Sequence, residues 1–321
     1  MPDPDVTLAA IERARERIAD RVRCTPILHN ETLDTLLGAH LSFKCECLQQ
    51  TGAFKARGAV NAVFSLSDDR LRAGVVTHSS GNHGAAVAYA ARLRGVPATV
   101  VMPTNSSAAK FDAVRDLGAR ILTCEPTLTA REARAAQFVA ETGAAFVHPY
   151  DDPDVIAGQG TLALELLQQQ PDLDWVLVPV GGGGLLSGVA TAVKALRPQI
   201  RVIGVEPARA DDAARSFRLG SLVPYQVPDT IADGLRGALS ERTLAIIRQR
   251  VDEIVTVSEQ GIVAAMRTLW ERLKVTVEAS SAVPFAALLE APPAMREAIC
   301  GRRVGIVLTG GNVDLKTLPW S

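Results

Sequence analysis

One lysine lies among small and apolar residues, in the segment QTGAFKARGA at Gln50–Ala59. A lysine amine that is removed from water loses its proton more easily and can then act as a nucleophile or a base. The segment is equally compatible with a side chain that extends its ammonium group into solvent. Lys55 is therefore a candidate catalytic amine, and its role depends on what surrounds it.

Four consecutive glycines (Gly181, Gly182, Gly183 and Gly184) follow the apolar stretch Trp175–Val180 and precede a helical pattern. Without side chains, several backbone N–H groups can converge on one anion. Four glycines are entropically costly for a turn alone, so phosphate binding is favoured over a simple turn. The run matches neither GxGxxG nor GxxxxGK[ST], which disfavours a nicotinamide or nucleoside triphosphate site.

A third polar loop, THSSGNHG at Thr77–Gly84, joins a predicted strand to a predicted helix. Backbone N–H groups at a helix N-terminus suit a carboxylate or a phosphate, although such a loop often only caps its helix. In open α/β sheets ligands bind beyond the carboxyl ends of strands, where all three loops are expected.

Short strands and helices alternate from Val75 onwards, which predicts a parallel sheet with right-handed crossovers. We expect a small domain at 74–146, inserted between the two parts of a larger one, 1–73 and 147–321. Strands are predicted at Leu41–Leu48, Val75–Thr77, Ala98–Met102, Arg120–Thr123, Ala145–Val147, Trp175–Val180, Arg201–Val205 and Arg303–Leu308. Helices are predicted at Ala85–Leu93, Ser107–Leu117, Ala130–Glu141, Gly160–Gln168, Gln260–Arg272 and Pro284–Glu290.

The composition favours a small-molecule site. The chain has 321 residues, 47% of them hydrophobic, and a formal net charge of −1 without any Lys/Arg block, which disfavours nucleic acid or an anionic membrane as a partner. The first residues lack the pattern of a signal peptide and no apolar run approaches ~18 residues, so we expect a cytoplasmic protein. Five cysteines without a CxxC pair indicate neither a disulfide framework nor a zinc site.

The three loops occur together in the order of one known family. The sequence resembles the fold-type II pyridoxal-phosphate enzymes, which are α/β proteins, and within them the serine racemase and serine/threonine dehydratase group. The matching stretches cover nearly the whole chain: TGAFKARGA at 51–59, THSSGNHG at 77–84, VIAGQGT at 155–161, PVGGGGLLSG at 179–188, EPARADD at 206–212, TIADG at 230–234 and LTGGNVDL at 308–315.

The resemblance implies pyridoxal 5'-phosphate as the cofactor and assigns its contacts. Lys55 would carry the cofactor, Phe54 would pack beside its ring, and Asn82 would hydrogen-bond its 3'-oxygen. The backbone of the glycine run would hold the phosphate, and Thr309 would face the pyridine nitrogen. Serine is frequent in the family at this last position, and threonine keeps the hydroxyl.

The resemblance also implies a substrate site and a cation site. The substrate carboxylate would bind the loop Ser79, Ser80, Gly81, Asn82 and His83, with Ser80 on the cofactor face opposite Lys55. Arg131 aligns with a substrate-loop arginine; it could meet a second carboxylate or simply lie on the solvent face of a helix. Glu206, Asp212 and the Ala210 carbonyl match a site for Mg²⁺, Ca²⁺ or Mn²⁺, although these carboxylates could also be solvated charges.

The expected activity is an ammonia-lyase that converts L-serine, L-threonine or L-threo-3-hydroxyaspartate to a 2-oxo acid and ammonia. Lys55 would remove the Cα proton of the amino acid, which leads to loss of the β-hydroxyl. The alternative is a serine or amino-acid racemase on the same site, with Ser80 as its second acid–base group. The stretch after TIADG, 235–238, lacks the serine of the closest racemases. A cofactor-binding protein without catalysis is disfavoured by Lys55, Ser80 and the hydroxyl at 309. A homodimer is expected from the resemblance.

Overall fold

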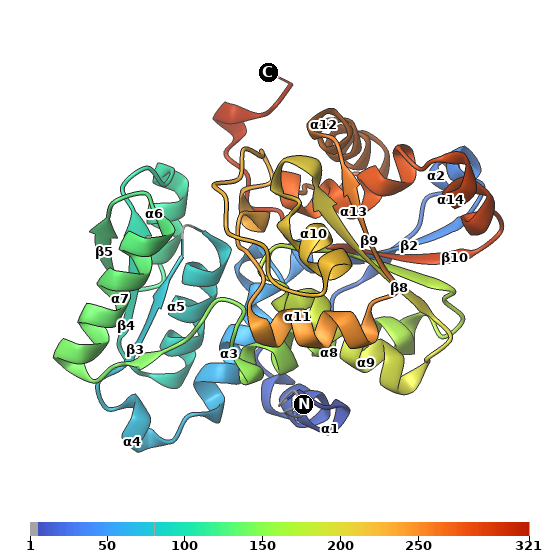
Figure 1. Cartoon of the computed structure of the whole chain (residues 1–321). Coiled ribbons are helices and arrows are strands. Elements are labelled where there is room, and N and C mark those ends of the chain that lie inside the picture. Colours follow the sequence, from blue (N-terminus) through green and yellow to red (C-terminus); the bar gives the residue numbers. More distant parts are fainter. Residues whose placement is uncertain (1–5, 80, 321) are drawn as a thin grey trace.

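The computed structural model of the chain describes residues 6–79 and 81–320 and contains two β-sheets flanked by helices (Figure 1). The larger sheet has six strands in the order β1-β2-β10-β7-β8-β9. Its strands are parallel apart from the antiparallel pair β1–β2. Their bounds are β1 Ile27–Leu28, β2 His40–Cys45, β7 Trp175–Pro179, β8 Arg201–Pro207, β9 Glu253–Val257 and β10 Arg303–Leu308.

The smaller sheet has four parallel strands in the order β5-β4-β3-β6. It is built entirely from the part of the chain where the sequence alternates between strands and helices, and it confirms the predicted α/β fold. The strands are β3 Val75–His78, β4 Ala98–Pro103, β5 Arg120–Cys124 and β6 Ala145–Phe146. The division into domains at 74 and 146 stays a prediction.

Helices cover the sheets, and the two regions lie side by side, with α4 to α7 around the smaller sheet (Figure 1). The long helices are α1 Leu8–Ile18, α3 Lys55–Ser65, α5 Asn82–Arg94, α7 Leu128–Thr142, α8 Pro153–Gln169, α9 Gly184–Leu196, α11 Glu241–Arg250, α12 Glu259–Thr268 and α13 Ala279–Leu289. The shorter ones are α2 Glu31–Leu37, α4 Asp68–Leu71, α6 Ala108–Arg115, α10 Asp212–Leu219 and α14 Pro293–Ile299.

Several predicted boundaries were wrong. The helix predicted from Pro284 begins at Ala279, and the one predicted to end at Arg272 is α-helical only to Thr268. Two other differences have clear local reasons. The helix predicted from Gly160 begins at Pro153, because Asp152 caps it by accepting hydrogen bonds from the N–H groups of Asp154 and Val155. The strand predicted over Leu41–Leu48 ends at Cys45, where a 3-10 turn at Glu46–Leu48 begins. Cys47 therefore leaves the strand on which we expected it to lie.

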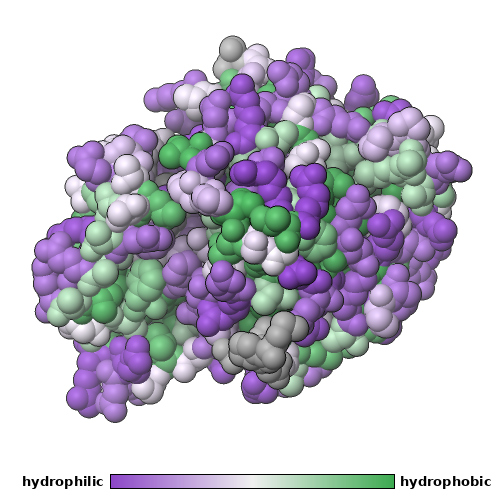
Figure 2. Space-filling model, viewed as in Figure 1, coloured by the Kyte–Doolittle hydropathy of each residue, from purple (hydrophilic) through white to green (hydrophobic). Residues whose placement is uncertain are grey.

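The core follows from the apolar strands and from helices that are buried on most sides. In the larger region β7 and the middle of α8 are buried, so α8 lies between neighbours and packs against α3 and α9. Hydrophilic side chains cover much of the face seen in Figure 2, interrupted by hydrophobic patches. Within residues 6–79 and 81–320, no helix is both long enough and apolar enough to cross a membrane.

Candidate active site

Lys55 is the first residue of α3 and projects into the protein. The preceding turn is attached to the end of β10, because the N–H of Phe54 donates to the Thr309 carbonyl over 3.0 Å. The Lys55 Nζ atom donates to the Pro149 carbonyl over 2.7 Å and lies 5.2 Å from the centre of the Phe54 ring. Burial lowers the pKa of Lys55 to about 8. About a tenth of this amine is thus unprotonated at pH 7, far more than for an ordinary lysine.

The glycine run connects β7 to α9 and offers unpaired donors. The N–H groups of Gly182, Gly183 and Gly184 have no hydrogen-bond acceptor within the described chain. Gly183 has φ of 84°, a conformation that glycine adopts without strain. Unpaired N–H groups at the start of a 13-residue helix form a receptor for an anion. These residues fit the phosphate of the cofactor expected from the sequence.

Tight packing also explains these glycines. A Cβ atom added to Gly182 would overlap the Tyr150 ring, and one added to Gly181 would lie 2.8 Å from the Leu235 Cα atom. Tyr150 directly follows Pro149, whose carbonyl accepts from Lys55. The segment Pro149–Tyr150 therefore joins the Lys55 amine to the glycine run, which the sequence pattern did not indicate.

The polar loop after β3 leads into α5, whose first residue is Asn82. The Asn82 Nδ2 atom donates to the Glu278 Oε1 atom over 2.8 Å, and its Oδ1 atom accepts from Asn312 Nδ2 over 2.8 Å. Ser79 accepts from the N–H of Gly81 over 3.1 Å, which shapes the loop. Ser80, the expected second catalytic group, lies outside the described residues.

His83 lies deeper, next to Lys55. Its ring is buried, its Nε2 atom lies 3.3 Å from the Val147 carbonyl oxygen, and its Nδ1 atom has no partner in the described chain. Burial, followed by the positive charge of Lys55, lowers the pKa of His83 well below its usual range. His83 is therefore a neutral neighbour of the lysine and not a competing cation.

Thr309 and Glu278 lie at the end of β10, to which the turn before Lys55 is attached. Thr309 is buried directly after β10, beside the Lys55 turn. Glu278 is buried at the start of α13, and a Cβ atom on Gly310 would lie 2.6 Å from its Oε1 atom. We missed Glu278 at the sequence level, although a single acid in the otherwise uncharged stretch VTVEASSAVPF was an available signal.

Arg131 lies in the first turn of α7 and is half-buried. It makes no ion pair with any residue of the described chain. Burial lowers the pKa of His78 to about 4, and the charges of His148 and Arg131 contribute to the shift. The positive charge of Arg131 therefore helps to lower the pKa of His78. His78 is the last residue of β3 and directly precedes the loop at Ser79–His83.

The predicted cation ligands lie together at the end of β8. Glu206 is buried and accepts from the N–H groups of Ala213 and Ala214 over 3.0 and 2.9 Å. Burial raises the pKa of Glu206 to about 9 and that of Asp212 to about 6, and each is further raised by a nearby carboxylate. Neither acid has an ion-pair partner in the described chain, so the pair fits a bound cation.

Any such cation needs more than side-chain ligands. Across residues 6–79 and 81–320, no group of three or more His, Cys, Asp or Glu side chains is arranged to hold a metal. The Ala210 carbonyl, on the turn Ala208–Ala210 between the two acids, is the third ligand expected from the sequence. Two carboxylates, a carbonyl and water are the oxygen ligands that Mg²⁺ and Ca²⁺ prefer.

A buried ion cluster lies behind the Lys55 helix, which sequence reasoning did not foresee. Arg57 forms ion pairs of 2.7 Å with both Glu46 and Glu165, and Glu165 also pairs with Lys44 over 2.7 Å. Arg57, Glu46 and Lys44 are fully buried. The cluster joins β2, α3 and α8, so it fixes the helix that begins with Lys55.

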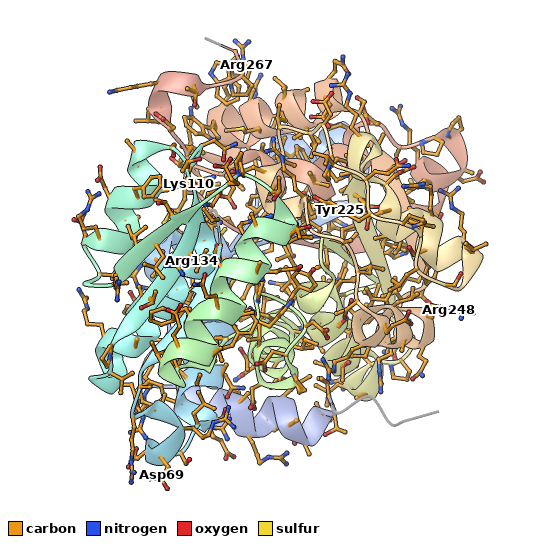
Figure 3. The ribbon with its side chains drawn as sticks, turned by 60° about the vertical axis from the view of Figure 1, so that its left-hand side comes forward. Asp69, Lys110, Arg134, Tyr225, Arg248 and Arg267 are labelled. Atoms are coloured by element: carbon orange, nitrogen blue, oxygen red, sulfur yellow. The ribbon has the colours of Figure 1, made fainter. Side chains whose placement is uncertain are left out.

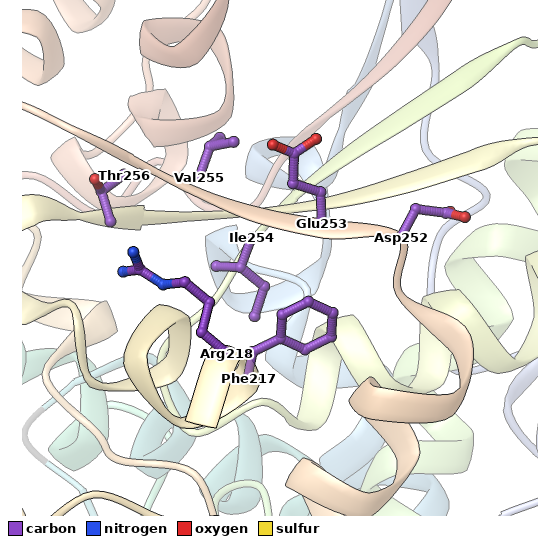
Figure 4. Close-up of a pocket in the computed structure, with 7 residues that line it drawn as sticks. All are labelled: Phe217, Arg218, Asp252, Glu253, Ile254, Val255 and Thr256. Atoms are coloured by element: carbon purple, nitrogen blue, oxygen red, sulfur yellow. The ribbon is translucent and has the colours of Figure 1, made fainter. Parts of the chain in front are cut away.

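An open surface pocket of about 470 Å³ lies elsewhere, between the end of α10 and β9 (Figure 4). It is lined by Phe217, Arg218 and the segment Asp252–Thr256. None of these residues belongs to the groups around Lys55, so this pocket is not the candidate site.

Comparison with known proteins agrees with this arrangement. Residues 18–310 match the family model described as "Pyridoxal-phosphate dependent enzyme". The chain is 50% identical to a beta-hydroxyaspartate dehydratase of Paracoccus denitrificans, covering 96% of each chain. It is 48% identical to an L-threo-3-hydroxyaspartate ammonia-lyase of Saccharomyces cerevisiae, covering 94% of this chain and 92% of the yeast protein.

A solved structure of maize serine racemase has the same fold, with a TM-score of 0.95 and 44% identity, covering 98% of this chain and 96% of the maize chain. A family model that spans most of the chain, together with relatives of this identity, establishes the family. The chain belongs to the pyridoxal-phosphate dependent enzymes of fold type II, the family that its loops had indicated.

Proposed function

We propose that this chain is an ammonia-lyase that converts β-hydroxy-α-amino acids to 2-oxo acids and ammonia. The observation that carries the proposal is the Lys55 amine, whose pKa is lowered by burial to about 8 and whose only hydrogen bond in the described chain is to a neutral carbonyl. An unprotonated amine at this position can accept the Cα proton of an amino acid. When bound, pyridoxal phosphate supplies the electron sink that makes this proton acidic.

The other residues would bind and orient the reactants. The unpaired N–H groups of Gly182, Gly183 and Gly184 would hold the cofactor phosphate. The N–H groups at the start of α5 would receive the substrate carboxylate, as the sequence predicted for Ser79–His83. Thr309 would present a neutral hydroxyl to the pyridine nitrogen. A neutral hydroxyl cannot hold a proton there as a carboxylate can, which is compatible with elimination or racemisation.

Among the possible substrates we favour L-threo-3-hydroxyaspartate, which has a second carboxylate. Arg131 is a half-buried cation without an ion-pair partner in the described chain. Its charge contributes to the lowered pKa of His78, which directly precedes the proposed substrate loop. A guanidinium binds a carboxylate through two parallel hydrogen bonds. The similarity to two proteins named for hydroxyaspartate, at 50% and 48% identity, supports the same choice.

The direct test is release of a 2-oxo acid from serine, threonine and 3-hydroxyaspartate, each in both stereochemical series. Arg131→Ala should raise KM for 3-hydroxyaspartate about tenfold or more, the effect of losing a hydrogen bond to a charged group, and should change serine kinetics much less. Arg134→Ala is the matched control, because Arg134 (labelled in Figure 3) is another half-buried arginine of the same helix, and its side chain donates to Gln137. Equal effects on both substrates would contradict the role of Arg131.

A racemase on the same site is the second candidate, supported by the similarity to maize serine racemase. Chiral chromatography of the remaining serine in the same samples measures this activity. We further propose a cation at Glu206, Asp212 and the Ala210 carbonyl, and a homodimer. Analytical ultracentrifugation tests the homodimer.

A further inference from the structure

Glu278 immediately precedes α13 but does not cap it. A residue at this position commonly accepts a hydrogen bond from an N–H group of its own helix, and the Glu278 side chain accepts none. Instead its Oε1 atom accepts from Asn82 Nδ2 over 2.8 Å. Glu278 belongs to the region of the larger sheet and Asn82 to that of the smaller sheet, so this contact joins the two regions.

The orientation of the Asn82 amide is fixed from both ends. Asn312 Nδ2 donates to the Thr51 carbonyl and to Asn82 Oδ1, each over 2.8 Å, so both of its N–H bonds are used. Asn82 must therefore present its oxygen to Asn312 and its nitrogen to Glu278. The second N–H bond of Asn82 has no acceptor in the described chain and remains free for a ligand.

The Glu278 carboxyl group is held in place by close packing against the segment after β10, which also accepts a hydrogen bond from the N–H of Phe54. Its own backbone N–H donates to the Gly310 carbonyl over 3.0 Å. A side chain on Gly310 would displace the carboxyl group, because a Cβ atom there would lie 2.6 Å from Oε1. Glu278 is thus fixed against Gly310, the residue that directly follows Thr309.

The carboxyl group is also kept largely neutral. Burial, together with the negative charge of Asp233, raises the pKa of Glu278 to about 8, while Lys110 and the hydrogen bond from Asn82 lower it. Lys110, labelled in Figure 3, forms an ion pair with Asp233, so its charge is not a dedicated counter-ion for Glu278. At neutral pH a protonated carboxyl group accepts from Asn82 through its carbonyl oxygen and adds no negative charge near the cofactor.

We propose that Glu278 is a positioning residue for the lyase reaction, which holds the Asn82 amide so that its free N–H bond points at the 3'-oxygen of the cofactor. The inference rests on the proposed function, because it takes the contact between Asn82 and the cofactor from there. Glu278 itself need not touch the cofactor or the substrate.

A double-mutant cycle tests this role through cofactor affinity. The four proteins are the wild type, Glu278→Ala, Asn82→Ala and the double variant, each stripped of cofactor and titrated with pyridoxal phosphate by absorbance. Each single variant should weaken binding about tenfold, the effect of one hydrogen bond. The double variant should bind no more weakly than Asn82→Ala, because Glu278 acts through Asn82. Losses that multiply in the double variant would overturn the proposal.

Two further variants separate positioning from general stability. Glu278→Gln has nearly the same shape and keeps a carbonyl acceptor for Asn82, so it should restore most of the affinity that Glu278→Ala loses. Glu290→Ala removes a carboxylate that accepts from Ser258 just beyond the other end of α13, and it should leave cofactor affinity unchanged. A Glu278→Gln protein as weak as Glu278→Ala would contradict the inference. If the wild type bound no cofactor or released no 2-oxo acid, the proposed function itself would fail.

Discussion

Lys44 and Lys55 are both enclosed by this fold, but their surroundings differ. Lys44 is fully buried and donates to the Glu165 carboxylate over 2.7 Å, to the Thr25 carbonyl and to Gln169. Lys55 donates only to the Pro149 carbonyl within the described chain, and burial lowers its pKa to about 8. An enclosed lysine beside an anion serves as a structural cation, whereas one without an anion becomes a reactive amine.

The carboxylates of the ion cluster and of the end of β8 differ in the same way. Burial alone would raise the pKa of Glu165, but Arg57 and Lys44 lower it below its usual value. At the end of β8, burial raises the pKa of Glu206 to about 9, because no cationic side chain of the described chain pairs with it. The ion cluster behind α3 is complete by itself, whereas Lys55 and Glu206 have no oppositely charged side chain as a partner in the described chain.

The largest effect is expected from Lys55→Ala. The variant loses the only enclosed amine that lacks a carboxylate partner in the described chain. Release of 2-oxo acid should fall by about 10²–10⁴-fold, the usual contribution of a general acid or base. The unfolding free energy should change little, because no ion pair is broken. Activity within tenfold of the wild type would exclude Lys55 as the catalytic base.

Lys44→Met should produce the opposite pattern. It leaves the half-buried Glu165 with Arg57 as its remaining cationic partner, and breaking an ion pair whose lysine is fully buried should cost about 3 kcal/mol. Urea unfolding should show this loss, while kcat of the folded, cofactor-saturated protein stays close to that of the wild type. A variant as stable as the wild type would show that the ion cluster does not stabilise α3.

Removal of divalent cations should have a smaller effect. If Glu206 and Asp212 bind Mg²⁺, a concentration of 100 times Kd would stabilise the folded protein by about 2.7 kcal/mol. A chelator should therefore lower the Tm of the wild type, and added Mg²⁺ should restore it. Asp212→Ala should respond to neither. Identical responses of the two proteins would favour solvated charges over a cation site.

The last prediction concerns how the rate of cofactor capture by Lys55 depends on pH. In cofactor-free protein, the rate at which Lys55 captures pyridoxal phosphate should depend on the unprotonated amine. Because its pKa is lowered to about 8, the rate should rise about tenfold per pH unit below pH 8 and become constant above it. Stopped-flow absorbance measures this rate, with Lys55→Ala as the blank. A rise that continues to pH 10 would indicate an ordinary, solvated lysine.

The sequence predicted those parts of the fold that depend on local patterns. The alternating strands and helices from Val75 to Val147 were found close to their predicted bounds, because the apolar strands and the intervening helices have distinct periodicities. The strand β9 was missed, because Glu253–Val257 mixes exposed and buried residues and lacks a clear pattern. The helix α3 was also missed. Its residues 56–63 are all buried, including an arginine and an asparagine, so its polar residues do not mark an exposed face.

The site was predictable to the extent that each loop has its own residue pattern. The lysine, glycine and asparagine loops were identified singly, and their grouping came from the resemblance to a family. Contacts between distant segments left no local signal, as with Pro149 and Lys55, which are 94 residues apart. The pairing of Asn82 with Glu278, 196 residues apart, likewise depends on the packing of the two regions.

The most direct test of the account asks which enclosed lysine carries the cofactor. Wild-type protein is loaded with pyridoxal phosphate, reduced with borohydride to make the linkage permanent, digested and analysed by mass spectrometry. The account predicts a phosphopyridoxyl group on the peptide that contains Lys55 and none on the peptide that contains Lys44. Modification of Lys44, or of several lysines in similar amounts, would contradict the assignment of Lys55 as the reactive amine.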